Sequence, residues 1–236
     1  MAQAFDAGRM ADNVAEIRRR MAQAAIAAGR RPEEVLLCAA CKSRTPEIIR
    51  ESALLQMDLF GENRVQELLA NTEAGAYQGK PCHFIGHLQT NKVKKVVGLV
   101  AVIQSVDSLR LLEAIQVEAA GQNLIQDILF EINIGEELSK DGAAKDDFWP
   151  MLEAAAAMRS VRVRGLMAIP PAYDSESESR RYFAMMRQLL EQARERHYNN
   201  CLLDTLSMGM TDSYEAAILE GATIVRVGTG IYGARE

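Results

Sequence analysis

Residues 34–42 read EVLLCAACK, and residues 46–56, after a short Ser-Arg-Thr connection, read PEIIRESALLQ. The first run is short and apolar with polar ends, which is typical of a strand buried on both faces. The second begins with proline after Thr45, a sequence that suits the first turn of a helix, and continues with helical periodicity. Together they predict one strand followed by one helix.

The same pairing recurs along the whole chain. Short apolar or β-branched runs predict eight strands, at Glu34–Lys42, Met57–Gly61, Cys82–Gly86, Val100–Ser105, Asp127–Ile134, Arg162–Ile169, Asp204–Met208 and Thr223–Gly228. Helical periodicity predicts helices between them, at Pro46–Gln56, Arg64–Thr72, Thr90–Val97, Ser108–Ala120, Lys145–Arg159, Ser175–Arg196 and Asp212–Glu220. An extra N-terminal helix is indicated by apolar residues at helical spacing, namely Val14, Ile17, Met21 and Ala24.

This alternation predicts parallel strands joined by right-handed crossovers. Eight such units in 236 residues indicate a single (β/α)8 TIM-type barrel domain spanning residues 1–236, since such barrels run to about 250 residues. The alternative is an open doubly wound sheet, which a G-x-G-x-x-G motif after the first strand would favour. The first strand instead ends in Cys41-Lys42-Ser43, so the barrel is the preferred prediction.

Composition narrows the class of protein. Apolar residues make up 48% of the chain and charged residues 25%, with a net charge of −5, as in ordinary globular domains. Nucleic-acid binding is disfavoured because it needs clustered basic residues, and we interpret the one such cluster, Lys92 to Lys95, as a solvated helix face. No apolar run approaches the roughly 20 residues of a membrane span.

Four cysteines are present, and Cys38 and Cys41 have the C-x-x-C spacing of redox or metal sites. Their run reads as a strand, in which residues three apart point to opposite faces. We therefore interpret the cysteines as free thiols, which suits a reducing compartment and predicts a cytoplasmic location.

Sites in barrels of this kind lie at the carboxyl ends of the strands. Lys42 ends the first strand, and a lysine in a desolvated mouth can become a nucleophilic amine that condenses with an aldehyde. The alternative is that Lys42 only marks where the strand meets water. Asn63, after the second strand, could bond a ring substituent or act locally in a turn.

The last two strands end in Ser207-Met208-Gly209 and in Arg226-Val-Gly228-Thr229. Loops after strands 7 and 8 often bind phosphate, where glycines admit the anion and hydroxyls add donors. A lysine opposite a phosphate cradle is what pyridoxal 5′-phosphate requires. Arg226 could face the pyridine nitrogen of that cofactor or form a buried ion pair. His83 and His87 flank a strand end, so we expect no metal site.

These motifs resemble the pyridoxal phosphate homeostasis protein family, which is related to the N-terminal barrel domain of alanine racemases. The matching segments span nearly the whole chain: CKSRTPEII, LFGENRVQEL, CHFIGHLQTNKVK, INIGEELSKDG, GLMAIPP, LSMGMTDSYEAAI and TIVRVGTGIYG. The resemblance implies that Lys42 forms the aldimine. It also implies that Ser207, with the adjoining Met208, and Gly228 and Thr229 hold the phosphate, that Arg226 faces the pyridine nitrogen, and that Asn63 lies near the cofactor.

Two positions depart from the family pattern: Cys41 stands where Ser or Thr is usual, and Ala168 where Thr is usual. The function that the resemblance implies is buffering and delivery of the cofactor without a catalytic reaction. The expected partners are the cofactor itself and, transiently, PLP-dependent apoenzymes, and a monomer is expected. The alternatives are an amino-acid racemase and an interaction protein whose barrel has lost its ligand.

Overall fold

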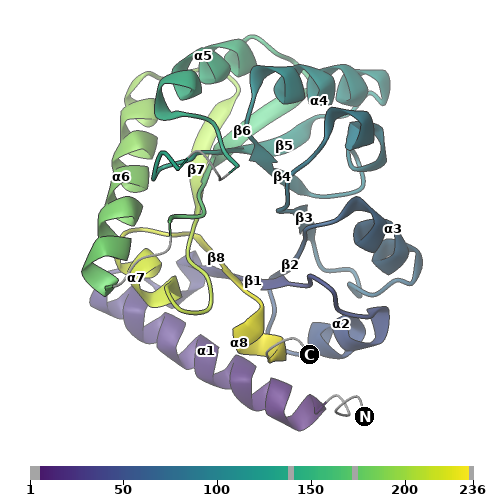
Figure 1. Cartoon of the computed structure of the whole chain (residues 1–236), viewed down its shortest axis with the longest axis vertical. Coiled ribbons are helices and arrows are strands. Elements are labelled where there is room, and N and C mark those ends of the chain that lie inside the picture. Colours follow the sequence, from purple (N-terminus) through teal and green to yellow (C-terminus); the bar gives the residue numbers. More distant parts are fainter. Residues whose placement is uncertain (1–5, 138–140, 172–174, 234–236) are drawn as a thin grey trace.

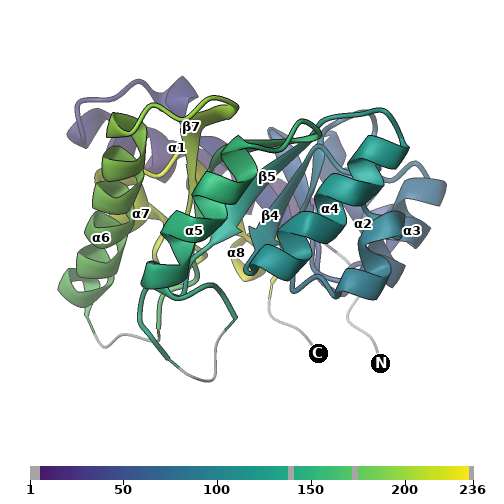
Figure 2. The same cartoon turned by 90° about the horizontal axis from the view of Figure 1, so that it is seen from above.

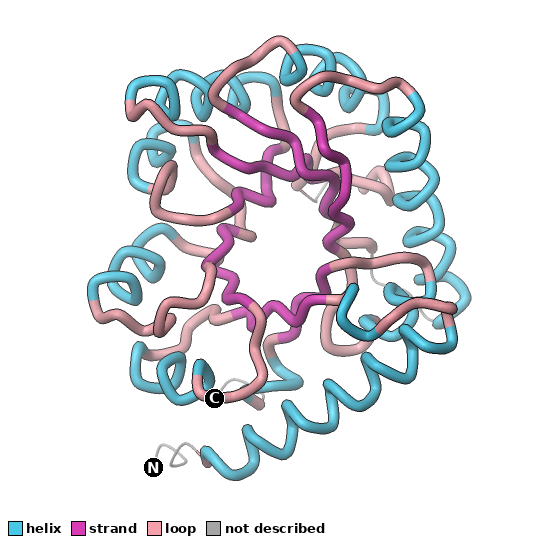
Figure 3. Tube along the Cα trace, turned by 180° about the vertical axis from the view of Figure 1, so that it is seen from behind, coloured by secondary structure: helices cyan, strands magenta, loops and turns pink. Residues whose placement is uncertain are grey.

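Eight parallel strands close into a barrel in chain order, with the eighth strand pairing with the first (Figure 3). The computed structural model describes residues 6–137, 141–171 and 175–233. The strands are β1 (Leu36–Ala40), β2 (Leu59–Glu62), β3 (Cys82–Phe84), β4 (Val102–Val106), β5 (Gln126–Glu131), β6 (Val161–Met167), β7 (Cys201–Ser207) and β8 (Ile224–Val227). The predicted TIM-type barrel is therefore confirmed.

Helices form an outer layer around this barrel (Figures 1 and 2). They are α1 (Ala7–Ala27), α2 (Pro46–Ala53), α3 (Val65–Glu73), α4 (Leu109–Gly121), α5 (Lys145–Ala156), α6 (Glu176–Glu195), α7 (Tyr214–Leu219) and α8 (Thr229–Tyr232), with 3-10 helices η1 (Pro32–Glu34) and η2 (Thr90–Lys95). The structure differs from the sequence prediction in several details: η2 replaces an α-helix, β7 begins at Cys201, η1 and α8 were not expected, and several other elements begin or end a few residues from the predicted bounds.

The extra N-terminal helix compensates for the shortness of the last one. Since α8 has only four residues, it cannot cover β8 and β1 as a full helix would. The 21 residues of α1 run along this side of the barrel, past α7 and α8 (Figure 1). Asn13 on α1 donates from Nδ2 to the carbonyl of Ile231 on α8 at 3.1 Å. The first and last helices are thus bonded to each other.

Side chains alternate between the barrel interior and the helix layer. Leu37 and Ala39 on β1 belong to the large core shared with the helices. Cys38 between them belongs instead to a small cluster with Leu59 and Ile224, which the strand pleat turns toward the barrel axis. Cys38 and Cys41 therefore point to opposite sides, as their spacing predicts, and all four cysteines are free.

A bulge at Gly165 adjusts the register between β6 and β7. Its φ of +152° is unfavourable for other residues, and a Cβ there would lie 1.8 Å from the carbonyl oxygen of Thr205. Glycine is therefore required where the two strands approach. Bulges of this kind increase local twist, which helps a sheet to close.

Among the residues that are described, no helix has the length and apolarity needed to cross a membrane.

Candidate functional site

Lys42 lies in the turn that follows β1, at the carboxyl end of the barrel. Because Cys38 points inward, the strand pleat turns Ala40 toward the same side, and Lys42 follows two residues later in the turn. Lys42 is half-buried, and in the described part of the chain its amine has no hydrogen bond or ion pair. The structure thus places a lysine without a partner at the rim of the barrel mouth.

A chain of buried polar side chains crosses the interior below that rim. Arg226 on β8 is 4% exposed, and its guanidinium donates to Ser207 Oγ at 2.6 Å and to the Ala168 carbonyl at 2.9 Å. Ser207 Oγ lies 2.6 Å from Gln104 Oε1, and Gln104 Nε2 lies 2.7 Å from His83 Nδ1. Within the described residues Arg226 forms no ion pair, so its partners are neutral oxygens.

The protonation state of His83 determines the donor and the acceptor in each of these hydrogen bonds. Burial lowers the pKa of His83 to about 4, so its imidazole is neutral near neutral pH and Nδ1 can accept the Gln104 N–H. The Gln104 carbonyl oxygen then faces Ser207 and accepts its hydroxyl proton. Ser207 therefore presents its lone pairs to Arg226, and the hydroxyl holds the guanidinium in place.

A buried carboxyl shares this interior. Glu131 at the end of β5 is 5% exposed, and it has neither a hydrogen bond nor an ion pair in the described structure. Burial raises its pKa to about 7, while the positive charge of Arg226 acts in the opposite direction. Arg226 and Glu131 are thus two buried ionisable groups that interact electrostatically in this interior.

The loops after β7 and β8 are bonded to each other. Thr229 Oγ1 donates to Thr211 Oγ1 at 2.9 Å, and the Gly230 N–H donates to the same oxygen at 3.1 Å. Gly209 has φ +91°, and a Cβ there would lie 2.6 Å from Cβ of Ala217, so only glycine suits this turn. The two glycine-containing loops form one continuous rim.

This rim meets the end of β1 at Gly228. The register pairs Ala39 with Val227, which sets Gly228 beside Ala40. A Cβ at Gly228 would lie 3.3 Å from the Ala40 carbonyl oxygen. The loop of β8 and the turn that carries Lys42 are therefore immediate neighbours.

The structure places the predicted site residues Asn63 and Met208 differently. Asn63 is half-buried after β2, two residues beyond the inward-facing Gly61, and its carbonyl oxygen would lie 2.2 Å from a Cβ at Gly86. Met208 is fully buried in the core shared with the helices, and its N–H donates to Ile224 at 3.1 Å. The structure thus brings Asn63 to the rim but directs the Met208 side chain away from it.

The two departures from the family pattern lie outside the mouth. Cys41 Sγ points into the helix layer, 3.3 Å from the Ala39 carbonyl and 3.8 Å from the Tyr232 hydroxyl. Ala168 serves Arg226 through its backbone carbonyl, which any residue supplies. Neither substitution removes a polar group from the interior.

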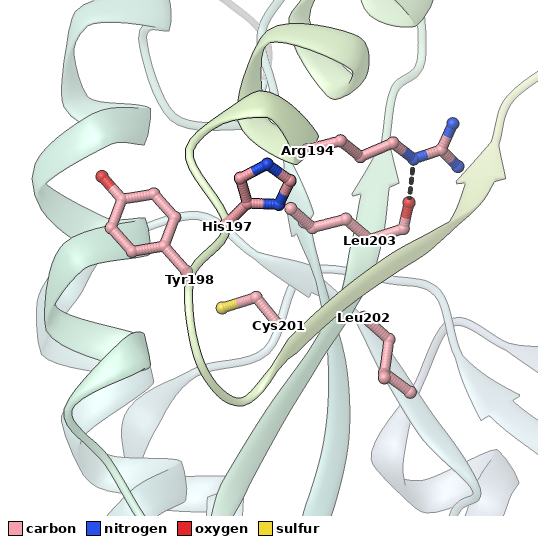
Figure 4. Close-up of a pocket in the computed structure, with 6 residues that line it drawn as sticks. All are labelled: Arg194, His197, Tyr198, Cys201, Leu202 and Leu203. Carbon is pink, nitrogen blue, oxygen red and sulfur yellow. Dashed lines mark hydrogen bonds between the residues drawn. The ribbon is translucent and has the colours of Figure 1, made fainter.

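A separate hollow of about 280 Å³ lies at the opposite, amino-terminal end of β7 (Figure 4). Its arginine is already bonded, because Arg194 Nε donates to the Leu203 carbonyl at 2.6 Å. The lining residues are Arg194, His197, Tyr198, Cys201, Leu202 and Leu203. Within the described ranges, no group of three His, Cys, Asp or Glu side chains is arranged to hold a metal ion.

Sequence reasoning did not identify Gln104, Glu131, Thr211 or Tyr232 as parts of this region. Two of them carry a readable signal: Gln104 and Glu131 are polar residues inside the apolar runs VIQSV and ILFEI. Such a residue in a buried strand needs a polar environment. Their position toward the barrel axis could have been inferred from the alternation alone.

Comparison with known proteins agrees with this geometry. The family described as "Alanine racemase, N-terminal domain" matches residues 5–236. A pyridoxal phosphate homeostasis protein of Aquifex aeolicus is 40% identical over 225 residues, covering 95% of this chain and 98% of the relative.

Solved structures show the same barrel. An unknown protein from Bifidobacterium adolescentis superposes with a TM-score of 0.90 at 34% identity, covering 96% of this chain and 95% of the other. PipY of Synechococcus elongatus, solved with PLP bound, has a TM-score of 0.83 at 30% identity and covers 95% and 100% of the two chains. The chain therefore belongs to the pyridoxal phosphate homeostasis protein family, whose barrel is that of the N-terminal domain of alanine racemase.

Proposed function

We propose that this protein binds pyridoxal 5′-phosphate in the barrel mouth, as a Schiff base on Lys42, and serves in cofactor homeostasis. The observation that carries the proposal is the contact between Ala40 and Gly228. It sets the turn that bears Lys42 directly beside the rim formed by the loops of β7 and β8. An aldehyde and a phosphate on one small molecule can reach both at once.

The bond on Lys42 would form by condensation. The amine nitrogen would add to the aldehyde carbon, a C=N bond would form, and the aldehyde oxygen would leave as water. The bound cofactor would supply an electron-withdrawing ring. A guanidinium cannot accept a proton, so Arg226 facing the ring nitrogen would keep that nitrogen unprotonated and the ring a weak electron sink.

The residues present fit the cofactor at each end. The rim offers backbone N–H groups, and the Thr229 hydroxyl would reach a phosphate by turning away from Thr211. Glycine stands at 228 and 230, where a Cβ would crowd Ala40 or Val227. The interior offers Arg226, whose guanidinium donates to Ser207 and to the Ala168 carbonyl. Ser207 would contact the phosphate by rotating its hydroxyl away from Gln104.

The homeostasis role follows from the names of the relatives. We propose buffering of the cofactor and its delivery to PLP-dependent apoenzymes through transient contact, by a monomeric protein of the cytoplasm, without turnover of an amino acid. Incubation with a panel of L-amino acids in deuterated water should give negligible exchange at the α-carbon. Rapid exchange with any one of them would support a racemase instead.

The direct test of Lys42 is chemical trapping. Wild-type protein loaded with the cofactor and reduced with borohydride should carry the pyridoxyl mass on the peptide containing Lys42, and Lys42→Ala should abolish the adduct. Lys145→Ala is the matched control, because Lys145 also follows a strand at this end of the barrel but pairs with Glu136 at 2.9 Å. Retention of the full adduct in Lys42→Ala would refute the assignment.

A further inference from the structure

The turn that carries Lys42 is held from outside the mouth by the last helix. The turn closes with the Arg44 N–H on the Cys41 carbonyl at 2.9 Å, and Ser43 within it has φ +62°, an unusual conformation for a residue with a side chain. A conformation of this kind persists only where surrounding contacts fix it. The end of α8 contacts residues that precede and residues that follow Lys42 in the sequence.

After Lys42, Arg44 is the attachment. Its guanidinium donates to the Gly233 carbonyl at 2.9 Å and lies 5.4 Å from the centre of the Tyr232 ring. The combination of a charge-assisted hydrogen bond and a cation–π contact fixes a planar guanidinium in one orientation. Arg44 therefore ties the far end of the turn to the end of α8.

Before Lys42, Tyr232 is the attachment. Its hydroxyl lies 3.0 Å from Ser52 Oγ on α2 and 3.8 Å from Cys41 Sγ. Ser52 already donates to the Ile49 carbonyl at 2.7 Å, so the Tyr232 hydroxyl donates to Ser52. The ring is thereby fixed between the end of β1 and the last turn of α2.

Helix α8 begins at the loop that is proposed to bind the phosphate. The Tyr232 N–H donates to the Gly228 carbonyl at 3.0 Å, and the Gly233 N–H donates to the Thr229 carbonyl at 2.9 Å. The two residues that contact the Lys42 turn are thus bonded, through one helical turn, to the two residues proposed to meet the phosphate. A shift of the loop must move Tyr232 and Gly233 as well.

We infer that α8 couples occupation of the 228–230 loop to the orientation of Lys42, with Tyr232 and Arg44 as the positioning residues. This inference rests on the proposed function, since it assumes phosphate at the loop and a Schiff base on Lys42. It predicts that a phosphate ion in the loop favours condensation of Lys42 with an aldehyde that carries no phosphate of its own.

The experiment separates the cofactor into its two parts. Apoprotein is mixed with pyridoxal, with and without inorganic phosphate, and the adduct on Lys42 is measured by borohydride trapping and by absorbance. Phosphate should tighten pyridoxal binding to wild type by roughly 5- to 150-fold, the usual range of coupling between two sites. Tyr232→Phe and Arg44→Met should each reduce this factor toward one while leaving the affinity for phosphate alone unchanged.

Tyr214→Phe is the matched control, because the Tyr214 hydroxyl is buried without a hydrogen-bond partner and lies on α7, the neighbouring helix. It should retain the wild-type factor. The inference is overturned if wild type shows no phosphate effect, if both positioning variants keep the full factor, or if Tyr214→Phe loses as much as they do. Failure of the proposed function gives a different result: wild type then traps no adduct on Lys42 even with pyridoxal 5′-phosphate itself.

Discussion

Replacing Glu62 by glutamine should change how the stability of the barrel depends on pH. Glu62 is fully buried at the end of β2. Its Oε1 accepts from Asn71 Nδ2 at 2.7 Å and from the Tyr77 hydroxyl at 3.0 Å. Its Oε2 has no partner, and no cation pairs with the carboxyl in the described structure.

The sign of the effect follows from the cause of the pKa shift. Burial raises the pKa of Glu62 from 4.5 to about 7, against the two hydrogen bonds that lower it. The folded protein therefore keeps a proton that the unfolded chain has released, and stability falls as the pH rises from about 4.5 to about 7. A pKa difference of one corresponds to about 1.36 kcal/mol. Ionisation of Glu62 alone should therefore lower the free energy of unfolding by about 2.5 kcal/mol between about pH 5 and about pH 8.

Glu62→Gln keeps an oxygen for Asn71 and Tyr77 but does not titrate. Urea denaturation of wild type and variant across this pH range should show the difference between their unfolding free energies shifting in favour of the variant as pH rises. Glu113→Gln is the control, because Glu113 is exposed on α4 and forms no ion pair in the described residues. Parallel wild-type and Glu62→Gln curves would refute the reasoning.

Two other perturbations test the barrel. Gly165→Ala should destabilise the protein by about 3 kcal/mol or more, because its Cβ would lie 1.8 Å from the Thr205 carbonyl and backbone must move; a denaturant midpoint near that of wild type would contradict this. Burial lowers the pKa of His83 from 6.5 to about 4, so wild type should lose unfolding free energy as the pH falls from about 6.5 to about 4. His83→Gln, which does not titrate, should not show this loss. The effect has the opposite sign to that of Glu62, and an unchanged acid limb in the His83→Gln denaturation series would show that the imidazole is already charged.

The barrel could be predicted because its strands are apolar runs that the helices bury, and the chain alternates between two clearly different periodicities. The strand ends then followed from topology, which is why Lys42, Asn63, Ser207, Arg226, Gly228 and Thr229 lie at or below one rim. Met208 shows the limit of this reasoning. Residues on a strand end alternate between mouth and helix layer, and the register that sends Ser207 inward sends Met208 outward.

Other parts depend on contacts between distant segments. The His83–Gln104–Ser207–Arg226 chain joins four strands, and no local pattern indicates which polar residues will meet. Helix α8 is too short to have a periodicity, and the early start of β7 falls in a stretch where Asn200 and Leu203 have positive φ angles. A 3-10 helix at Thr90–Lys95 and an α-helix there carry the same apolar spacing over so few residues.

The bond between Asn13 and Ile231 joins positions 218 residues apart, and it has a consequence for biosynthesis. At about 5–20 residues per second, roughly 10 to 40 seconds separate the translation of these two residues. Once β2 has been made, and for the rest of that interval, β1 has β2 as a neighbour but not β8, and its other edge offers unpaired backbone groups to any strand nearby. The nascent polypeptide thus carries Lys42 beside an open sheet edge, and the rim formed by the loops of β7 and β8 is complete only after ribosomes have delivered the final strand.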